Sequence, residues 1–358
     1  MAMESPALYE SLIAWASGHM STHDPSYKIT ALEARSRALS ALGASLAQQK
    51  DSSSHETNSA ACLVLLTSEV CLGNHCDWYN HLLGAKYTIL SAQAQAGTMN
   101  KVLCGPDALK SSPEGQWVLR NFAYHDILGS VTLGTEPLIE GNYLGDITDV
   151  VDTYLGVASG ILSLVSEINC LKGPTTGADG CSAFAQWCFR LESQVKNWSY
   201  QVDTSPELVA VAEAFRSASL IHLYRRWRSM LGQTPGALDD ASEKREEQTC
   251  GLYAKIQLEV SKIIIYVSRI SVHDFPETSL LFPLFLAGGE AEDRSGTEFI
   301  RERLQLMLQK RHFENIKQAL EVLEEVWARR FSNAGRLGDE DDTWEFVLRQ
   351  KGWKLLLT

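Results

Sequence analysis

The sequence lacks paired cysteines and long apolar runs. Its eight cysteines are scattered over 358 residues, and none stand in a CxxC pair. That spread fits reduced thiols better than a disulfide framework or a zinc cluster. The runs Val157–Val165 and Leu280–Ala287 are far shorter than the ~18 residues of a membrane helix. The opening MAMESPALYE has neither a basic nor an apolar signal region, so we expect no secretion and no membrane span.

The sequence also has fewer basic residues than acidic ones. The chain carries 32 Lys and Arg against 44 Asp and Glu, a formal net charge of −12. Affinity for DNA rests on Lys and Arg that neutralise phosphates, so we expect no direct nucleic-acid binding by this chain. The one basic-aromatic cluster, Tyr224–Arg228, is small, and arginines on the polar face of an amphipathic helix explain it.

Familiar catalytic motifs are absent. The sequence has no GxGxxG, no GxxxxGK(S/T), no HExxH and no GxSxG. An enzyme would therefore need a cryptic site, and the best candidate is the His125–Asp126 pair inside an apolar helix. Because buried ionisable groups need partners, Asp126 could instead satisfy Arg120 or cap a neighbouring helix. We favour this structural role and predict no catalytic residues and no cofactor.

Two groups of metal-ligand residues stand out. The denser one places Cys71, His75, Cys76, Asp77 and His81 within eleven residues. Zinc binds such thiolates and imidazoles, but the spacing is not that of a familiar zinc site. We therefore favour a helix end followed by a new helix capped by Asp77, with no metal bound. His19 and His23 are four residues apart, where Asp24-Pro25 predicts the end of a helix, and we read them as a surface pair.

Hydrophobic periodicity predicts an all-α fold. Apolar residues recur at three- and four-residue spacing over long windows, and strand signals are almost absent. We expect a single large irregular helical domain over residues 1–358, without a sheet of note. The expected helices are Pro206–Gly232 capped by Ser205, Ala60–Leu72, Tyr154–Leu171, Lys255–Ile270, and a C-terminal segment that starts at an N-cap, Thr297, and breaks near Lys310–His312. Gln48–Ser59 is expected to be a polar loop.

A ligand pocket is a further hypothesis. Aromatic and apolar side chains with a few polar groups can line a cavity between helices. The candidate lining residues are Tyr79, Phe122, Tyr124, His125, Phe184, Trp187, Trp198 and Tyr266. Ordinary core packing explains the same residues, and the sequence alone leaves both interpretations open.

Several segments resemble one known family. They are Ser17-Gly18-His19-Met20, the Trp-Tyr-x-His-Leu-x-Gly-Ala stretch Trp78–Ala85, the segments Phe122–Thr132 and Tyr154–Leu171, the run Leu280–Gly296, the segment Leu323–Arg330 and the closing block Asp342–Thr358. In this order they are similar to the fungal-specific transcription factor domain, the regulatory region found behind zinc-binuclear-cluster DNA-binding modules. The six-cysteine basic segment of such a cluster is absent from this chain, so we expect either a trimmed module or a naturally cluster-less relative.

The resemblance implies a regulatory or effector domain that controls transcription through a small molecule or a protein partner. It implies a nuclear location, homodimerisation and contacts with coactivators or other transcription proteins. Some relatives, such as the sterol-uptake regulators, sense a small apolar effector in this region. The acidic run Asp339–Asp342, followed by Trp344 and Phe346, is a candidate coactivator contact, although a solvated loop before a packed helix explains it more simply. The alternative from another class is a helical enzyme or cofactor-dependent protein with a cryptic site near His125–Asp126.

Overall fold

The computed structural model describes residues 1–48, 52–73, 77–96, 101–173, 178–200, 203–232, 240–272, 275–332 and 342–358, and these residues confirm the all-α fold. Their α-helices are α1 (Pro6–Ser21), α2 (Tyr27–Ala47), α3 (Ser52–Leu72), α4 (Trp78–Ser91), α5 (Pro106–Leu109), α6 (Pro113–Leu133), α7 (Ile161–Asn169), α8 (Ala178–Asn197), α9 (Pro206–Gly232), α10 (Asp240–Ser268), α11 (Leu281–Glu290), α12 (Arg294–Arg311), α13 (Glu314–Ser332) and α14 (Trp344–Lys351). The 3₁₀ segments η2 (Gly141–Asp146) and η3 (Phe275–Leu280) and a short antiparallel hairpin of β1 (Gln93–Ala96) and β2 (Lys101–Cys104) complete them. Among these residues, no helix is both long enough and apolar enough to cross a bilayer.

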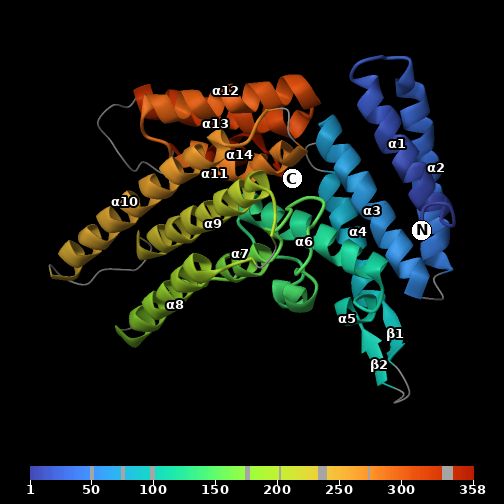
Figure 1. Ribbon diagram of the computed structural model, residues 1–358, viewed down its shortest axis with the longest axis horizontal. Coiled ribbons are helices and arrows are strands. Elements are labelled where there is room, and N and C mark those ends of the chain that lie inside the picture. The colour runs from blue at the N-terminus through green and yellow to red at the C-terminus, as the bar shows by residue number, and fades with distance from the viewer. Residues whose placement is uncertain are drawn as a thin grey trace.

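The helices form two groups that meet at α6 and the C-terminal end of the chain (Figure 1). In the N-terminal group α1 packs against α2 and α3, and α3 packs against α4 and α6. In the other group α11 contacts α9, α10, α12 and α13. Every residue of α11 is buried, as expected for a helix whose residues before Glu290 are all apolar or glycine. Its Pro283 lies in the first turn, where no intrahelical hydrogen bond is lost.

Helix ends follow the local sequence in most places. Leu208 donates its backbone N–H to the hydroxyl of Ser205 at 3.4 Å, and α9 runs to Gly232, as predicted. The predicted break in the C-terminal segment is also confirmed, because His312 adopts a left-handed conformation between α12 and α13. The prediction of Thr297 as an N-cap is wrong. Asp293 fills that role one turn earlier, where its carboxylate accepts the N–H of Gly296 at 2.6 Å.

Two predicted elements need correction. The helix expected over Tyr154–Leu171 begins only at Ile161. Before it, Gly156 has a φ of +56°, and its backbone exchanges hydrogen bonds of 2.8 and 3.0 Å with Asp152. A residue with a side chain rarely adopts that φ, so glycine here directs a tight turn rather than a helix. The polar loop predicted over Gln48–Ser59 is wrong from Ser52 on, where α3 begins, and residues 49–51 of that segment lie outside the described residues.

Candidate functional site

The segment after α14 (residues 353–358) lies buried between helices that are distant in the sequence. Leu355, Leu356 and Leu357 are all buried in the core, although the segment is not helical. Trp78 of α4 donates its indole N–H to the carbonyl of Lys354 at 2.8 Å. Further contacts come from α6 and α13, so three helices hold the segment.

These two contacts also pair a side chain with a backbone carbonyl. Thr132 of α6 donates its hydroxyl to the carbonyl of Leu355 at 2.6 Å. The side-chain amide of Asn315 of α13 donates to the carbonyls of Leu356 and Thr358, at 3.2 and 2.9 Å. A buried backbone that forms no helix or strand needs such partners, so these residues are what allow the segment to lie inside the fold.

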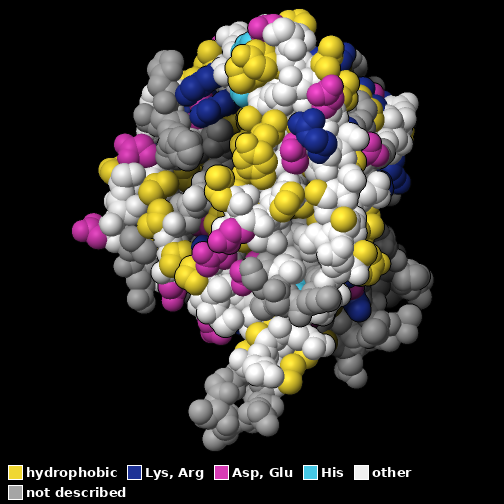
Figure 2. Space-filling model, turned by 90° about the vertical axis from the view of Figure 1, so that its right-hand side faces the viewer, with side chains coloured by type: hydrophobic (Ala, Val, Ile, Leu, Met, Phe, Trp, Pro, Cys, Tyr) yellow, Lys and Arg dark blue, Asp and Glu magenta, His cyan; other side chains and the backbone are white. Residues whose placement is uncertain are grey.

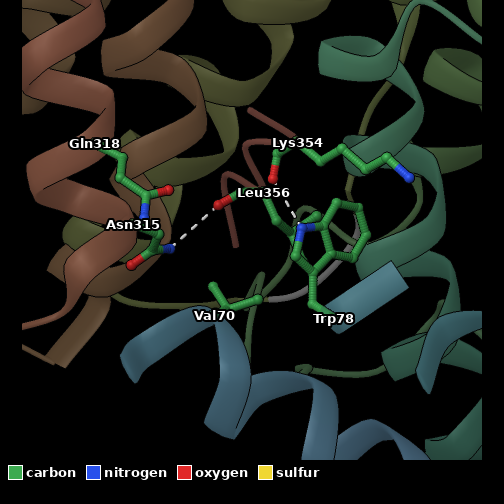
Figure 3. Close-up of a pocket in the computed structure, with 6 residues that line it drawn as sticks. All are labelled: Val70, Trp78, Asn315, Gln318, Lys354 and Leu356. Carbon is green, nitrogen blue, oxygen red and sulfur yellow. Dashed lines mark hydrogen bonds between the residues drawn. The ribbon is translucent and has the colours of Figure 1, made fainter. Parts of the chain in front are cut away.

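A hollow adjoins this segment (Figure 3). It is lined by Val70, Trp78, Asn315, Gln318, Lys354 and Leu356, and its empty volume is about 180 Å³, open solvent included. Pockets for drug-sized ligands hold roughly 300–1,000 Å³. The amide oxygen of Asn315 is buried and has no hydrogen-bond partner. The hollow therefore suits a water-sized polar group better than a large apolar effector.

His125 and Asp126 lie in α6 and bond different segments. The Nδ1 atom of His125 is 2.8 Å from the hydroxyl oxygen of Thr358. The carboxylate of Asp126 accepts the backbone N–H groups of Leu138 and Ile139 at 2.9 and 3.1 Å. Asp126 thus fixes the turn after α6, whereas Arg120, its expected partner, pairs with Asp152 at 3.0 Å.

Burial shifts the pKa values of both groups. Desolvation lowers the pKa of His125 to about 3, and it raises the pKa of Asp126 to about 6 despite the two backbone hydrogen bonds. At neutral pH His125 is therefore uncharged. Its Nε2 atom is buried without a hydrogen-bond partner, as is the amide oxygen of Asn121.

The other predicted lining residues lie in separate parts of the fold. Tyr79 of α4 lies under the ammonium group of Lys354, 4.7 Å from its ring centre. Phe122 and Tyr124 are buried in α6, and Tyr124 stacks on Tyr154 at 5.0 Å between ring centroids.

The remaining four come from α8, the turn after it and α10. Phe184 is buried in the core, and Trp187 is partly buried against it. Trp198 lies beneath Arg216 of α9, whose guanidinium carbon is 5.4 Å from the ring centre. Tyr266 packs at the edge of the core in α10, with Arg269 over its ring at 5.4 Å. The structure therefore brings together Tyr124 and His125, which are neighbours in sequence, but spreads the rest over several helices.

The basic-aromatic cluster Tyr224–Arg228 is folded inward. Only 8% of the Arg225 side chain is exposed, and its guanidinium pairs with Glu290 at 2.8 Å and with Glu345 at 2.6 Å. Arg228 reaches Glu290 at 3.4 Å, and Arg226 donates to the carbonyl of Leu171 at 2.6 Å. The expectation that these arginines lie on a polar surface is wrong for Arg225, because α9 is central and α11 and α14 supply its counter-charges.

The candidate metal ligands do not assemble among the described residues. His75 and Cys76 lie outside the described residues, and no group of three potential ligands is found among those described. Burial raises the pKa of the Cys71 thiol to about 12, which keeps it protonated. Asp77 precedes α4 but makes no side-chain capping bond, contrary to our expectation.

His19 and His23 do more than form a surface pair. α1 ends at Ser21, as Asp24-Pro25 predicted. The ring of His19 packs on Phe313 at 5.4 Å, and that of His23 packs on His312 at 4.5 Å between centroids. The end of α1 is thereby joined to the junction of α12 and α13, a long-range contact that the sequence pattern did not reveal.

Comparison with known proteins gives one match. No curated protein and no solved structure is similar enough to the chain to be matched. The profile of the fungal specific transcription factor domain matches residues 1–358. This match covers every segment described above, and it places the chain in the context of transcription regulation. The chain belongs to the fungal-specific transcription factor domain family.

Proposed function

We propose that this chain is a nuclear regulatory domain that controls transcription through contact with a protein partner and does not bind DNA itself. The family supports the transcriptional role. DNA recognition is then the task of another segment or another chain. Catalysis by His125 and Asp126 is not part of this proposal, because the Asp126 carboxylate is occupied by two backbone N–H groups.

The observation that carries the proposal is the neutralised arginine cluster of α9. Non-specific DNA binding comes from exposed Lys and Arg that displace counterions from phosphates. Here Arg225 and Arg228 pair with Glu290, and Arg225 also pairs with Glu345, within a chain of net charge −12. These guanidinium groups are therefore already engaged by carboxylates and are not presented to a nucleic acid.

A titration with labelled duplex DNA tests the DNA-binding part. Non-specific DNA-binding proteins have Kd values of about 10⁻⁴ to 10⁻⁶ M at physiological salt. We expect fluorescence anisotropy to show no saturable binding at protein concentrations up to about 10⁻⁴ M in ~150 mM salt. Tight, salt-dependent binding would contradict the proposal.

The described contacts bear on which protein surface is used. The coactivator contact considered at Asp339–Phe346 involves residues 339–341, which lie outside the described residues. Trp344 is buried, with its ring 5.5 Å from that of Phe285 and 4.6 Å from the guanidinium carbon of Arg225. Trp344 therefore anchors α14 to the core, and a partner surface has to be sought elsewhere.

A small-molecule effector is the second candidate. It is favoured by the unpartnered, buried Nε2 of His125 and amide oxygen of Asn121, which a polar ligand group or a water could bond. Native mass spectrometry of the chain purified from a fungal extract tests this candidate. One small molecule per chain that is released on denaturation would support an effector, and a chain of bare mass would count against it.

A further inference from the structure

Helix α2 carries a second apolar face that nothing in the described fold covers. Its inner face places Ala34, Ala38 and Leu42 in the buried core. On another face Ile29, Leu32, Leu39 and Leu46 are 70%, 58%, 42% and 40% exposed. Single exposed apolar residues are ordinary on protein surfaces. Four exposed apolar residues on the same side of one helix form a continuous apolar surface, which requires an explanation.

The spacing of these residues is that of a helix-packing seam. With Ser36 and Gly43 the exposed face reads 29, 32, 36, 39, 43, 46, a strict alternation of three and four residues. This heptad spacing keeps one face of a helix against a partner helix over its whole length. We name these six positions the α2 stripe. Figure 2 shows hydrophobic side chains gathered on the side of the molecule to which α1 and α2 belong.

We propose that the α2 stripe is a homodimer interface, in which α2 packs antiparallel on α2 of a second copy across a twofold axis. The register follows from side-chain size. Ile29 then faces Leu46 of the second copy, Leu32 faces Gly43, and Leu39 faces Ser36, so each leucine near the centre meets a small residue. An added Cβ at Gly43 would meet no atom within 4 Å in its own chain, which leaves an open notch for the incoming leucine.

The parallel arrangement fits less well. It would place Gly43 on Gly43 and Ser36 on Ser36, leaving voids whose lining loses packing contacts. It would also stack Leu32 on Leu32 and Leu39 on Leu39. The antiparallel pairing uses the same patch twice in a self-complementary way, which is the requirement for a closed twofold dimer.

Charge around the stripe also favours a second copy. The whole chain is strongly acidic, but α2 itself carries Lys28, Arg35 and Arg37 against a single Glu33. Arg37 pairs with Glu10 at 3.0 Å and with Glu33 at 3.8 Å, and Arg35 pairs with Glu69 at 2.5 Å. Two copies can therefore approach here without bringing unpaired acidic groups together, whereas most of an acidic surface would repel itself.

The contact length sets the expected strength. A helix of 21 residues is about 31 Å long. A pair of such helices lies toward the small end of stable interfaces, which bury roughly 800 Å² per partner. We therefore expect a concentration-dependent dimer with a Kd on the order of micromolar. This inference goes beyond the proposed function, because the association does not itself require a regulatory role.

Sedimentation equilibrium of the whole chain tests the dimer. We expect the wild type to dimerise over micromolar concentrations and Leu39→Glu to weaken the dimer at least about a hundredfold, because the twofold axis introduces the charge twice. Ile265→Glu on α10, at a residue that is 50% exposed, is the matched control and should dimerise like the wild type. A monomeric wild type, or a Leu39→Glu chain that dimerises normally, would overturn the proposal.

Gly43→Leu separates association from folding. In the monomer it replaces a helical glycine with a better helix former at an open position, so the melting temperature should rise. In the dimer it fills the notch that receives Leu32, so association should weaken at least tenfold. A variant that is more stable and equally dimeric would refute the large-against-small register.

Cysteine crosslinking tests the direction. In a background with Cys76, Cys104, Cys170, Cys181 and Cys250 replaced by Ser, so that of the native cysteines only the buried ones remain, Ile29→Cys and Leu46→Cys chains should form a disulfide when mixed. Ile29→Cys alone should not crosslink, and if it does, the pairing is parallel. Sedimentation and crosslinking do not depend on transcription. A chain that stays monomeric would therefore overturn the dimer and not the proposed function, whereas a chain that dimerises but does not change transcription of a reporter gene would overturn only the proposed function.

Discussion

At the scale of single residues, the most consequential feature is the pair of buried titratable groups in α6. Burial lowers the pKa of His125 and raises that of Asp126, each away from its ordinary value. Their linkage to stability has opposite signs. Between pH 6.5 and about 3 the folded state holds fewer protons on His125 than the unfolded state does. Lowering the pH in this range therefore decreases the free energy of unfolding. Between about pH 6 and 3.8 the folded state holds more protons on Asp126 than the unfolded state does. Lowering the pH in this range therefore increases the contribution of Asp126 to the free energy of unfolding.

His125→Gln removes the first contribution and leaves the second. As the pH falls from 6 to 4, the free energy of unfolding of the variant should rise relative to that of the wild type by about 1.4 kcal/mol per pH unit. Urea unfolding of both chains at pH 4, 5, 6 and 7 measures this difference. A difference that stays constant across these pH values would show that His125 does not titrate as its burial requires.

The hydrogen bonds that Asn315 donates to the C-terminal segment can be tested in the same way. Asn315→Ala removes the amide that serves the carbonyls of Leu356 and Thr358 and leaves both without that donor. We expect a loss of about 1–3 kcal/mol in the free energy of unfolding. Lys317→Ala, on the same helix at a half-exposed ion pair with Glu314, should cost less than about 1 kcal/mol. Equal losses in chemical denaturation would contradict the anchoring role of Asn315.

At the scale of elements, predictions succeeded where the pattern was local. The break predicted near Lys310–His312 is the one that His312 makes between α12 and α13. The turn at Gly156 escaped prediction because one of the contacts that hold it comes from a residue far away in the sequence. Asp152, which bonds the backbone of Gly156, is itself held by Arg120 of α6. An apolar run around such a turn cannot be told from a buried helix by periodicity alone.

The packing of α14 on α11 depends on a glycine. A Cβ at Gly289 would lie 2.6 Å from Cδ1 of Trp344, a buried ring that cannot easily move. Gly289→Ala should therefore cost about 1–3 kcal/mol of stability. The contrasting variant Gly251→Ala, in α10 with no atom within 4 Å of the new Cβ, should be neutral or gain up to ~1 kcal/mol. Thermal melts of both variants measure the contrast, and a Gly289→Ala chain as stable as the wild type would contradict this packing.

At the scale of the whole molecule, the two helix groups share the C-terminal segment as a common core element. Trp78, Thr132 and Asn315 contact it from α4, α6 and α13, across 276, 223 and 41 residues of sequence. Trp78 belonged to a motif on which the family resemblance rests, but its carbonyl partner could not be inferred, because such pairing is set by tertiary packing. The candidate lining residues of the pocket rest on side-chain composition alone. Composition does not distinguish a ring that fills the core from one that lines a cavity.

The central claim is that this chain regulates transcription without touching DNA. The most direct measurement fuses residues 1–358 to an unrelated DNA-binding module and follows a reporter gene in a fungal host. We expect that tethering the wild-type chain changes reporter transcription severalfold, while the module alone does not. A correctly folded, nuclear fusion that leaves the reporter at the level of the module alone would show that this chain does not regulate transcription.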